Sequence, residues 1–310
     1  MRLAAIDLGT NTVRLLTVDA DRGHGWRPLD QAQRVTRLGE GLASSGHLGE
    51  AAMARTAAAV AEYAARAAGL GAGRVLVVGT SAMREAANGA AFAAALESVT
   101  GHPVRILSGA DEARLTLRGV LWGLVPAAGV MVIFDIGGGS TEFIRARDGA
   151  LEAAVSLRLG VVPLAEEGGT AAGLQARVRS RIRRELPPAI RAAGVDQLVG
   201  TAGTVTTLAA LDQELTVYDP ARIHRYTLTR GAVERQQARL ATRSVAEIAQ
   251  LPCLEPGRAD LIRPGIAITL AVMEALAVES LLVSEYGLRE GIVAEALESG
   301  RWLDTPLANA

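Results

Sequence analysis

Short apolar runs that end at an aspartate open two stretches of the chain. Leu3–Ile6 leads into Asp7, and Val130–Phe134 leads into Asp135. Runs of this length, bounded by turn residues, are typical of buried strands. A glycine-containing turn and a second apolar run follow each aspartate. Each stretch therefore predicts two antiparallel strands joined by a tight turn.

The two turns follow one pattern. Asp7–Thr12 and Asp135–Thr141 each place an aspartate and then a glycine directly after a strand, and their aspartates are 128 residues apart in the sequence. The strands after the turns are predicted over Val13–Asp19 and Glu142–Arg145. A repeat of this length indicates two duplicated domains rather than a solenoid of short repeats.

The remaining pattern alternates helix and strand. Helices are predicted over Leu48–Ala68, Asn88–Thr100, Ala110–Leu121, Gly173–Ala193 (with an early stop near Pro187), Val205–Asp212, Arg263–Ala277 and Arg289–Glu298. Strands are predicted over Val75–Val78, Val104–Leu107, Gln197–Val199 and Ser280–Val283. The fold class is thus mixed α/β, with domains over 1–122 and 123–310. The final helix is free to pack back on the first domain, and a cleft between the domains is the expected site.

Composition narrows the chemistry. The 310 residues are 49% hydrophobic and carry 32 basic against 33 acidic residues, a net charge of −1 that argues against a generic nucleic-acid binder. The sequence contains arginine but no lysine, which excludes a P-loop lysine and a Schiff-base lysine. A phosphate ligand would therefore be bound by backbone N–H groups, arginines or a metal.

Cysteine, histidine and targeting patterns exclude further classes. The single Cys253 cannot form an intrachain disulfide, and it reads as a partly buried small hydrophobe. The four histidines are scattered, so a zinc hydrolase is not expected, and a hard metal held by carboxylates stays open. The chain shows no signal-peptide core and no membrane-spanning run, and the expected location is the cytoplasm.

Four Gly-, Thr- and Ser-rich turns are candidates for phosphate binding. They lie at Asp7–Thr12, Gly79–Ala82, Asp135–Thr141 and Gly200–Thr206. Successive N–H groups of such turns form nests for phosphate oxygens, and the last turn opens a helix, whose positive end favours an anion. A single turn of this kind is most often an ordinary connection, but the four together favour phosphate. Asp7 and Asp135, each at the end of a buried strand, either bind Mg²⁺ or cap their own turns.

These residues closely resemble the motifs of the exopolyphosphatase/guanosine pentaphosphate phosphohydrolase (Ppx/GppA) family. The similar segments are Asp7–Leu15, Thr80–Asn88, Leu107–Ala113 and Asp135–Glu142, with weaker matches at Gly203-Thr204, His224, Arg258–Asp260 and Ser284–Gly291. The resemblance spans nearly the whole chain in order. It implies an actin-like fold of two domains around a cleft, in the short form that lacks extra C-terminal domains, and a homodimer.

The resemblance also implies a mechanism. Glu112 corresponds to the family's catalytic glutamate, a general base for water attack on a terminal phosphorus; the position before it, usually Glu, is Asp111 here. Asp135 and Glu142, with Asp7, would hold Mg²⁺, or Mn²⁺ in its place. The residues expected to bind phosphate oxygens are Thr10, Asn11, Arg84, Gly137, Gly138, Gly139, Ser140, Gly203 and Thr204. For Arg84, an ion pair with Glu85 or Asp111 is the alternative.

The expected function is release of orthophosphate from inorganic polyphosphate. Guanosine pentaphosphate hydrolysis stays open, as do an ATP-dependent kinase-like phosphotransferase and a non-catalytic nucleotide-binding module of the same fold. Membrane and specific nucleic-acid partners are not expected. The arginines of 177–184 either follow an extended polyanion or form a solvated surface, and Arg37 is expected to touch substrate.

Overall fold

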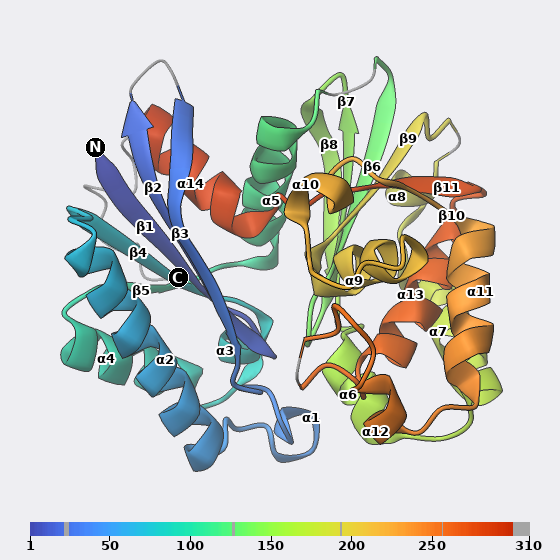
Figure 1. Ribbon diagram of the computed structural model, residues 1–310, viewed down its shortest axis with the longest axis horizontal. Helices are drawn as coiled ribbons and strands as arrows, with labels where there is room; N and C mark the ends of the chain where they lie inside the picture. Colours follow the sequence, from blue (N-terminus) through green and yellow to red (C-terminus); the bar gives the residue numbers. More distant parts are fainter. Residues whose placement is uncertain (22–24, 126–127, 193, 256, 300–310) are drawn as a thin grey trace. The chain divides into compact units, whose positions relative to one another are not determined.

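The computed structural model describes residues 1–21, 25–125, 128–192, 194–255 and 257–299 (Figure 1). These residues form two compact units. The first unit comprises Met1–Trp122 together with the described residues from Gly287 onward, and the second unit comprises Gly123–Tyr286. The second unit is therefore inserted between two segments of the first unit, the later of which contains α14 (Leu288–Ser299).

The sheet of the first unit has five strands in the order β3-β2-β1-β4-β5. These are β1 (Arg2–Leu8), β2 (Thr12–Asp21), β3 (Gly25–Val35), β4 (Arg74–Gly79) and β5 (Val104–Ile106). β1, β2 and β3 form an antiparallel meander, while β4 and β5 run parallel to β1. β1 is the central strand and every residue after Arg2 is buried, which explains its continuous apolar run.

Helices cover both faces of this sheet (Figure 1). They are α1 (Leu42–Ser45), α2 (Glu50–Gly69), α3 (Ser81–Glu85), α4 (Gly89–Thr100), α5 (Gly109–Gly123) and α14 (Leu288–Ser299). Ile6 and Leu8 of β1 belong to a core with α2 and α4, whereas Leu3 and Ala5 belong to a second core with α5 and α14. The alternation of side chains along β1 thus supplies both cores.

The second unit has a six-stranded sheet in the order β10-β11-β9-β6-β7-β8. Its strands are β6 (Val130–Ile136), β7 (Thr141–Arg147), β8 (Ala150–Leu157), β9 (Gln197–Thr201), β10 (Thr227–Thr229) and β11 (Ser280–Val283). β6, β7 and β8 form an antiparallel meander, and β9 and β11 add in parallel. The plan of the first unit, a meander continued by parallel strands, is repeated here.

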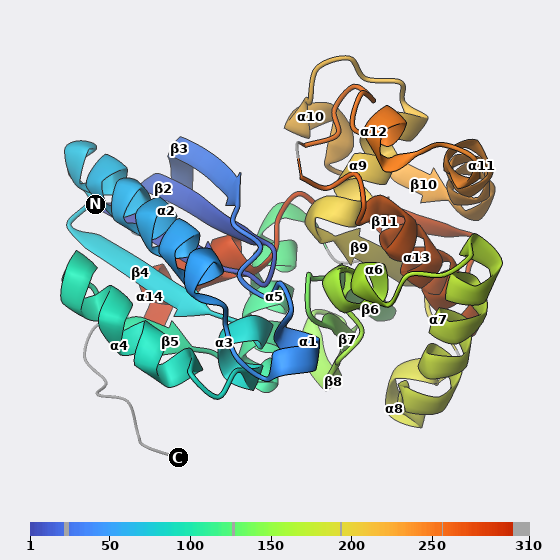
Figure 2. The same ribbon diagram turned by 90° about the horizontal axis from the view of Figure 1, so that it is seen from below.

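One large apolar core joins this sheet to its helices. The helices are α6 (Val161–Glu167), α7 (Ala171–Glu185), α8 (Pro188–Arg191), α9 (Ala202–Asp212), α10 (Pro220–Ile223), α11 (Arg230–Ala241), α12 (Val245–Ile248) and α13 (Ile262–Ala275). α13 is buried along most of its length because it packs beside α7, as Figure 2 shows, and also against α11.

The two predicted hairpins are confirmed, as β1–β2 and β6–β7. The third strand of each meander, β3 and β8, was not predicted. Both are edge strands with many exposed positions, so neither carries a continuous apolar run. The early stop predicted near Pro187 within Gly173–Ala193 is confirmed, because α7 ends at Glu185 and α8 begins at Pro188. Ala193, the end of that predicted range, lies outside the described residues. In the described parts of the chain, no helix is both long and apolar enough to cross a bilayer.

Candidate active site

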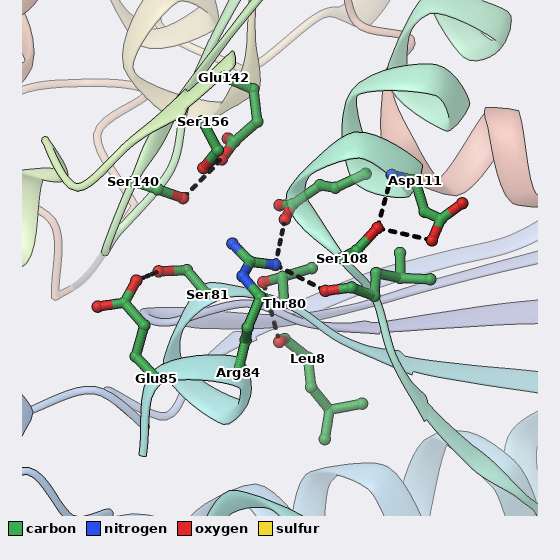
Figure 3. Close-up of polar contacts among 12 residues, drawn as sticks. Leu8, Thr80, Ser81, Arg84, Glu85, Ser108, Asp111, Ser140, Glu142 and Ser156 are labelled. Atoms are coloured by element: carbon green, nitrogen blue, oxygen red, sulfur yellow. Dashed lines mark hydrogen bonds and ion pairs between the residues drawn. The ribbon is translucent and has the colours of Figure 1, made fainter. Parts of the chain in front are cut away.

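In the first unit, Glu112 lies in the first turn of α5 and is 8% exposed. Its Oε2 accepts a hydrogen bond from Nη1 of Arg84 at 3.0 Å, and the same nitrogen donates to the carbonyl of Leu107 at 2.7 Å (Figure 3). Arg84 comes from α3. A charge-assisted hydrogen bond of this kind is stronger than a neutral one, and the second bond fixes the guanidinium. The pair therefore holds the Glu112 carboxylate in one orientation.

The expected alternatives for the partner of Arg84 were Glu85 and Asp111, and the structure shows Glu112 instead. Glu85 accepts from the Ser81 hydroxyl at 2.7 Å, and Asp111 accepts from the Ser108 hydroxyl at 2.7 Å (Figure 3). The Asp111 N–H in turn donates to the Ser108 hydroxyl at 3.1 Å. Asp111 thus secures the start of α5, and of the two adjacent acids it is Glu112 that faces Arg84.

The turn after β1 is held by the segment that follows β3. The N–H of Gly9 donates to the Thr12 carbonyl at 3.1 Å and closes the turn. The N–H of Gly39 donates to the Thr10 carbonyl at 2.8 Å, and the N–H of Arg37 donates to the Asn11 carbonyl at 3.0 Å. The structure thus brings the backbone of Arg37, which has φ 51°, beside two of the predicted phosphate ligands.

Asp7 ends β1 and is 7% exposed. Within the described residues its Oδ1 has no hydrogen-bond partner, so the reading in which this oxygen caps its own turn finds no support. Burial raises the pKa of this carboxyl above its usual range, against the opposing effect of Arg14, its register partner on β2, and of Arg289 on α14. An unsatisfied buried acceptor is costly, and a bound cation is one way to satisfy it.

The equivalent turn of the second unit follows β6. The N–H of Gly137 donates to the Ser140 carbonyl at 2.9 Å, as Gly9 does to Thr12 in the first unit. The Ser140 hydroxyl donates to Oε1 of Glu142 at 2.7 Å, and the Ser156 hydroxyl of β8 donates to the same oxygen at 2.7 Å (Figure 3). Sequence reasoning missed Ser156, because no pattern links a serine on an edge strand to a motif 14 residues away.

Asp135 and Glu142 face each other across β6 and β7 as direct register partners. Directly opposed residues project from the same face of a sheet, so the two carboxylates lie on one side of it. In the part of the chain that the structure describes, no group of three or more His, Cys, Asp and Glu residues is arranged for a metal. The pair nonetheless fits Mg²⁺, which binds one or two carboxylates and completes its shell with water and substrate phosphate.

Gly203 and Thr204 lie in the first turn of α9. A Cβ on Gly203 would lie 1.7 Å from Nη1 of Arg258, so glycine is needed for the arginine to pack on this turn. Nη2 of Arg258 lies 2.9 Å from Oε2 of Glu255. Thr204 packs against Gly265 of α13, where a Cβ would lie 2.3 Å from its Cγ2. A basic side chain therefore adjoins the start of α9, and only its place in a weak motif pointed to it.

The arginines of α7 and the single cysteine, Cys253, show no sign of a catalytic or binding role. Each of the five arginines of α7 has a glutamate within 2.7–3.9 Å, which favours the solvated-surface reading of that helix. Cys253 is partly buried, its Sγ donates to the Leu215 carbonyl at 3.0 Å, and burial raises the pKa of its thiol. A thiol of raised pKa is a poor nucleophile.

Comparison with characterised proteins gives full-length relatives. The chain is 35% identical to exopolyphosphatase 2 of Mycobacterium tuberculosis in an alignment that covers 94% of this chain and 97% of the relative. It is 31% identical to exopolyphosphatase 1 of Mycobacterium leprae over 96% of this chain and 90% of the relative.

Solved structures agree with the sequence relatives. A Ppx/GppA family member of Aquifex aeolicus is 29% identical, has a TM-score of 0.81, and aligns over 98% of this chain and 99% of its own. An exopolyphosphatase from Cytophaga hutchinsonii is 25% identical, has a TM-score of 0.89, and aligns over 96% of this chain and 98% of its own. The α/β, actin-like fold class expected from the resemblance is therefore confirmed.

The family model described as the Ppx/GppA phosphatase family matches residues 17–300, which is most of the chain. The structure also contains the two aspartate-headed turns, and in the first unit Glu112, at the positions of the motifs that resemble this family. The chain belongs to the Ppx/GppA phosphatase family.

Proposed function

We propose that this protein is an exopolyphosphatase, which releases orthophosphate from the end of inorganic polyphosphate by magnesium-assisted attack of water. The relatives named exopolyphosphatase, aligned over nearly their whole length, support the reaction class. The observation that carries the proposal is Glu112, a buried carboxylate at the start of α5 that Arg84 holds in place. A fixed carboxylate is suited to orient a water molecule and to accept its proton.

Glu112 is the general base in this mechanism. As the water oxygen bonds to the terminal phosphorus, the bridging oxygen leaves with the shortened chain, and the Glu112 carboxylate takes the water proton. Arg84 restricts the rotation of Glu112 and keeps its Oε2 oriented by the 3.0 Å hydrogen bond. Restricting the base in this way contributes to catalysis because the reacting groups then need little reorganisation.

The metal carboxylates are Asp135 and Glu142, with Asp7 as a further candidate. Mg²⁺, or Mn²⁺ in its place, would neutralise negative charge on the phosphoryl group during transfer. The hydroxyls of Ser140 and Ser156 fix one oxygen of Glu142, each at 2.7 Å, and so limit the orientations that its carboxylate can take. Ligand carboxylates are commonly held by such hydrogen bonds.

Backbone N–H groups bind the phosphate oxygens. The candidate groups are those of the turns at Thr10–Asn11 and Gly138–Ser140 and of the first turn of α9 at Gly203–Thr204. The Gly137 N–H, also expected to bind phosphate, is used within its own turn on the Ser140 carbonyl. The N-terminus of α9 adds the positive end of an 11-residue helix to the last of these turns, and Arg258 packs beside it. No lysine is available anywhere in the sequence, so arginine and backbone carry the whole of this task.

The test compares substrates side by side with the purified full-length chain and Mg²⁺. The substrates are polyphosphates of defined length, guanosine pentaphosphate, and ATP with sugar or acetate acceptors. Orthophosphate released at the highest kcat/KM from polyphosphate supports the proposal. Preference for guanosine pentaphosphate, or transfer of a phosphoryl group to an acceptor, would replace it. Binding without any turnover would indicate a non-catalytic module.

The metal assignment has a readout of its own. Removing divalent ions with EDTA should abolish turnover, and adding Mg²⁺ should restore it. Mn²⁺ binding, followed by electron paramagnetic resonance, should weaken in Asp135→Asn and Glu142→Gln but stay unchanged in Glu97→Gln, an exposed acid on α4. Unchanged Mn²⁺ binding in both site variants would remove these two residues from the metal site.

A further inference from the structure

The turn after β6 is gripped from one side by the start of α6. The N–H of Val161 donates to the Gly137 carbonyl at 3.2 Å, and the N–H of Val162 donates to the Gly138 carbonyl at 2.8 Å. These N–H groups lie in the first turn of α6, where a helix has donors with no partner of its own. Two consecutive carbonyls of the turn are therefore fixed in direction.

Fixing a carbonyl also fixes the N–H of the same peptide group. The peptide groups here are trans and planar, so the N–H points opposite to the C=O. The Gly138 N–H shares a peptide group with the Gly137 carbonyl, and the Gly139 N–H shares one with the Gly138 carbonyl. Both N–H groups must therefore point away from α6. Neither donates to a backbone carbonyl within the described residues, and both glycines are partly exposed.

Two other donors of this turn already have partners. The Gly137 N–H closes the turn on the Ser140 carbonyl at 2.9 Å, and the Ser140 hydroxyl donates to Glu142 at 2.7 Å. The turn therefore offers an anion two adjacent backbone donors, those of Gly138 and Gly139. Adjacent N–H groups aimed in one direction form the kind of nest that binds a phosphate oxygen.

Glycine at position 160 lets the start of α6 approach the turn closely enough to make these two hydrogen bonds. A Cβ at this position would lie 2.2 Å from the Gly138 oxygen and 2.3 Å from the Gly139 carbonyl carbon, distances that backbone atoms cannot accommodate without moving. The φ of Gly160 is −108°, so any residue could adopt its conformation, and the requirement for glycine is one of space alone. The chain thus needs a glycine where β8 leads into α6, outside every motif that sequence analysis singled out.

In the first unit, too, a carbonyl of the aspartate-headed turn is held by the segment that follows the third strand. Position 10 corresponds to position 138 in the 128-residue repeat, and the Thr10 carbonyl accepts from the Gly39 N–H at 2.8 Å. Gly39 follows β3, as Gly160 follows β8, and a Cβ on Gly39 would lie 2.3 Å from Cγ2 of Thr10. By the same peptide geometry the Asn11 N–H, equivalent to that of Gly139, points away from Gly39.

We propose that the segments after the third strands, Gly39 in the first unit and Gly160–Val162 in the second, are positioning residues for substrate. Each holds a carbonyl of its turn, and so directs the N–H groups of Asn11 in one unit and of Gly138 and Gly139 in the other toward phosphate oxygens. This inference rests on the proposed function and adds which backbone donors bind the polyphosphate and what orients them.

The first test changes the space beside the turn. Gly160→Ala should raise the dissociation constant for inorganic tripolyphosphate by about tenfold to a hundredfold, the size expected for losing a hydrogen bond to a charged group. Gly231→Ala in α11 is the matched control, since a Cβ there meets only the end of the Arg235 side chain at 3.7 Å. Titration calorimetry in the Glu112→Gln background measures binding without turnover.

The second test removes one donor and leaves the helix intact. Val161 is the first residue of α6, a position where proline is well tolerated, and the extended conformation of Gly160 suits a following proline. Val161→Pro deletes the N–H that holds the Gly137 carbonyl, whereas Val161→Ala keeps it and loses comparable side-chain volume. Val161→Pro should weaken tripolyphosphate binding several-fold more than Val161→Ala, and in the otherwise unchanged enzyme it should raise KM for polyphosphate more than it lowers kcat.

The outcomes separate this inference from the proposed function. Suppose that the unsubstituted protein hydrolyses polyphosphate but Gly160→Ala binds tripolyphosphate within twofold of Gly231→Ala. The close packing of α6 on the turn after β6 then has no role in binding, and the inference is overturned. Equal binding by Val161→Pro and Val161→Ala overturns it as well, and this pair decides the matter if Gly160→Ala does not fold. If the unsubstituted protein releases no phosphate from polyphosphate, the proposed function itself fails.

Discussion

Arg84 and Glu112 are 28 residues apart in the sequence, yet Nη1 of Arg84 lies 3.0 Å from Oε2 of Glu112. The same nitrogen is tied to the Leu107 carbonyl, which directly precedes the Ser108 that caps α5. The acid and the arginine are therefore held by one local framework built from α3, the end of β5 and the start of α5. In a phosphatase, that framework presents a carboxylate in a fixed orientation next to a positive charge.

Glu112→Gln should lower kcat on polyphosphate by roughly 10²–10⁴, because the amide keeps the shape of the side chain but cannot accept the water proton. Folding should be unaffected, as judged by thermal melting, and tripolyphosphate binding should stay close to that of the unsubstituted protein. Asp111→Asn is the control, since this neighbouring acid is engaged with Ser108. Hydrolysis by Glu112→Gln at a near-normal rate would show that another group is the base.

Arg84→Gln should reduce kcat because the carboxylate of Glu112 loses the donor that orients it. If the arginine acts through Glu112, its effect should largely vanish once Glu112 is already glutamine, since residues that act as a unit are strongly non-additive. A double-mutant cycle on kcat measures this coupling. Additive losses in the cycle would mean that Arg84 acts on the substrate independently of Glu112.

Asp7→Asn should make the protein more stable at neutral pH and less active. The pKa of Asp7 is raised by burial, so its contribution to stability is complete below the pKa of the unfolded chain and is lost as pH rises through the folded-state pKa. At neutral pH this buried carboxyl, with one oxygen lacking a hydrogen-bond donor, is expected to cost about 1–3 kcal/mol.

The stability gain of Asp7→Asn should therefore be largest at neutral pH and disappear near pH 3.8, the ordinary pKa of an aspartate side chain. Calorimetric melting temperatures across this range check the prediction, with Glu97→Gln as an exposed control. A gain that is independent of pH would contradict the assignment of the effect to the charge of Asp7.

Ala202 at the start of α9 should tolerate glycine and reject a β-branched residue. Its φ of 69° lies in the left-handed region, which costs a residue with a Cβ about 1–2 kcal/mol. Ala202→Gly should therefore change the free energy of unfolding little or raise it slightly, since the relieved strain offsets the added freedom of the unfolded chain.

Ala202→Val should instead destabilise the protein by about 1–3 kcal/mol and lower the affinity for tripolyphosphate, because the first turn of α9 cannot keep its shape. Urea denaturation and calorimetry provide the two measurements. Equal stability of the glycine and valine variants would mean that the backbone at this position does not carry strain.

The fold could be predicted where a local pattern repeated. The aspartate-headed turns at Asp7 and Asp135 follow strands that are buried on both faces, so their apolar runs are continuous and their hairpins were predicted correctly. β3 and β8 were missed because many of their positions are exposed and polar residues interrupt their apolar runs. Their absence from the prediction also hid the segments that leave them, including Gly160.

The candidate site could be predicted as a set of residues but not as a set of contacts. Motif position identified Glu112 and Arg84, while their pairing depends on how α3 and α5 meet in three dimensions. Ser156 and Gly160 have no distinguishing neighbours in the sequence. Their roles arise because β8 returns alongside β7 and ends beside the turn after β6, a consequence of tertiary structure alone.

The return of the chain to the first unit has a consequence for how the protein is made. Leu288 and Ile292 of α14 pack in the same core as Leu3 and Ala5 of β1, so that core is incomplete until α14 has been translated. The second unit is continuous from Gly123 to Tyr286 and is complete earlier. On the ribosome, the later-encoded unit should therefore reach its native state first, and the N-terminal segment should wait, exposed to chaperones, for the final helix.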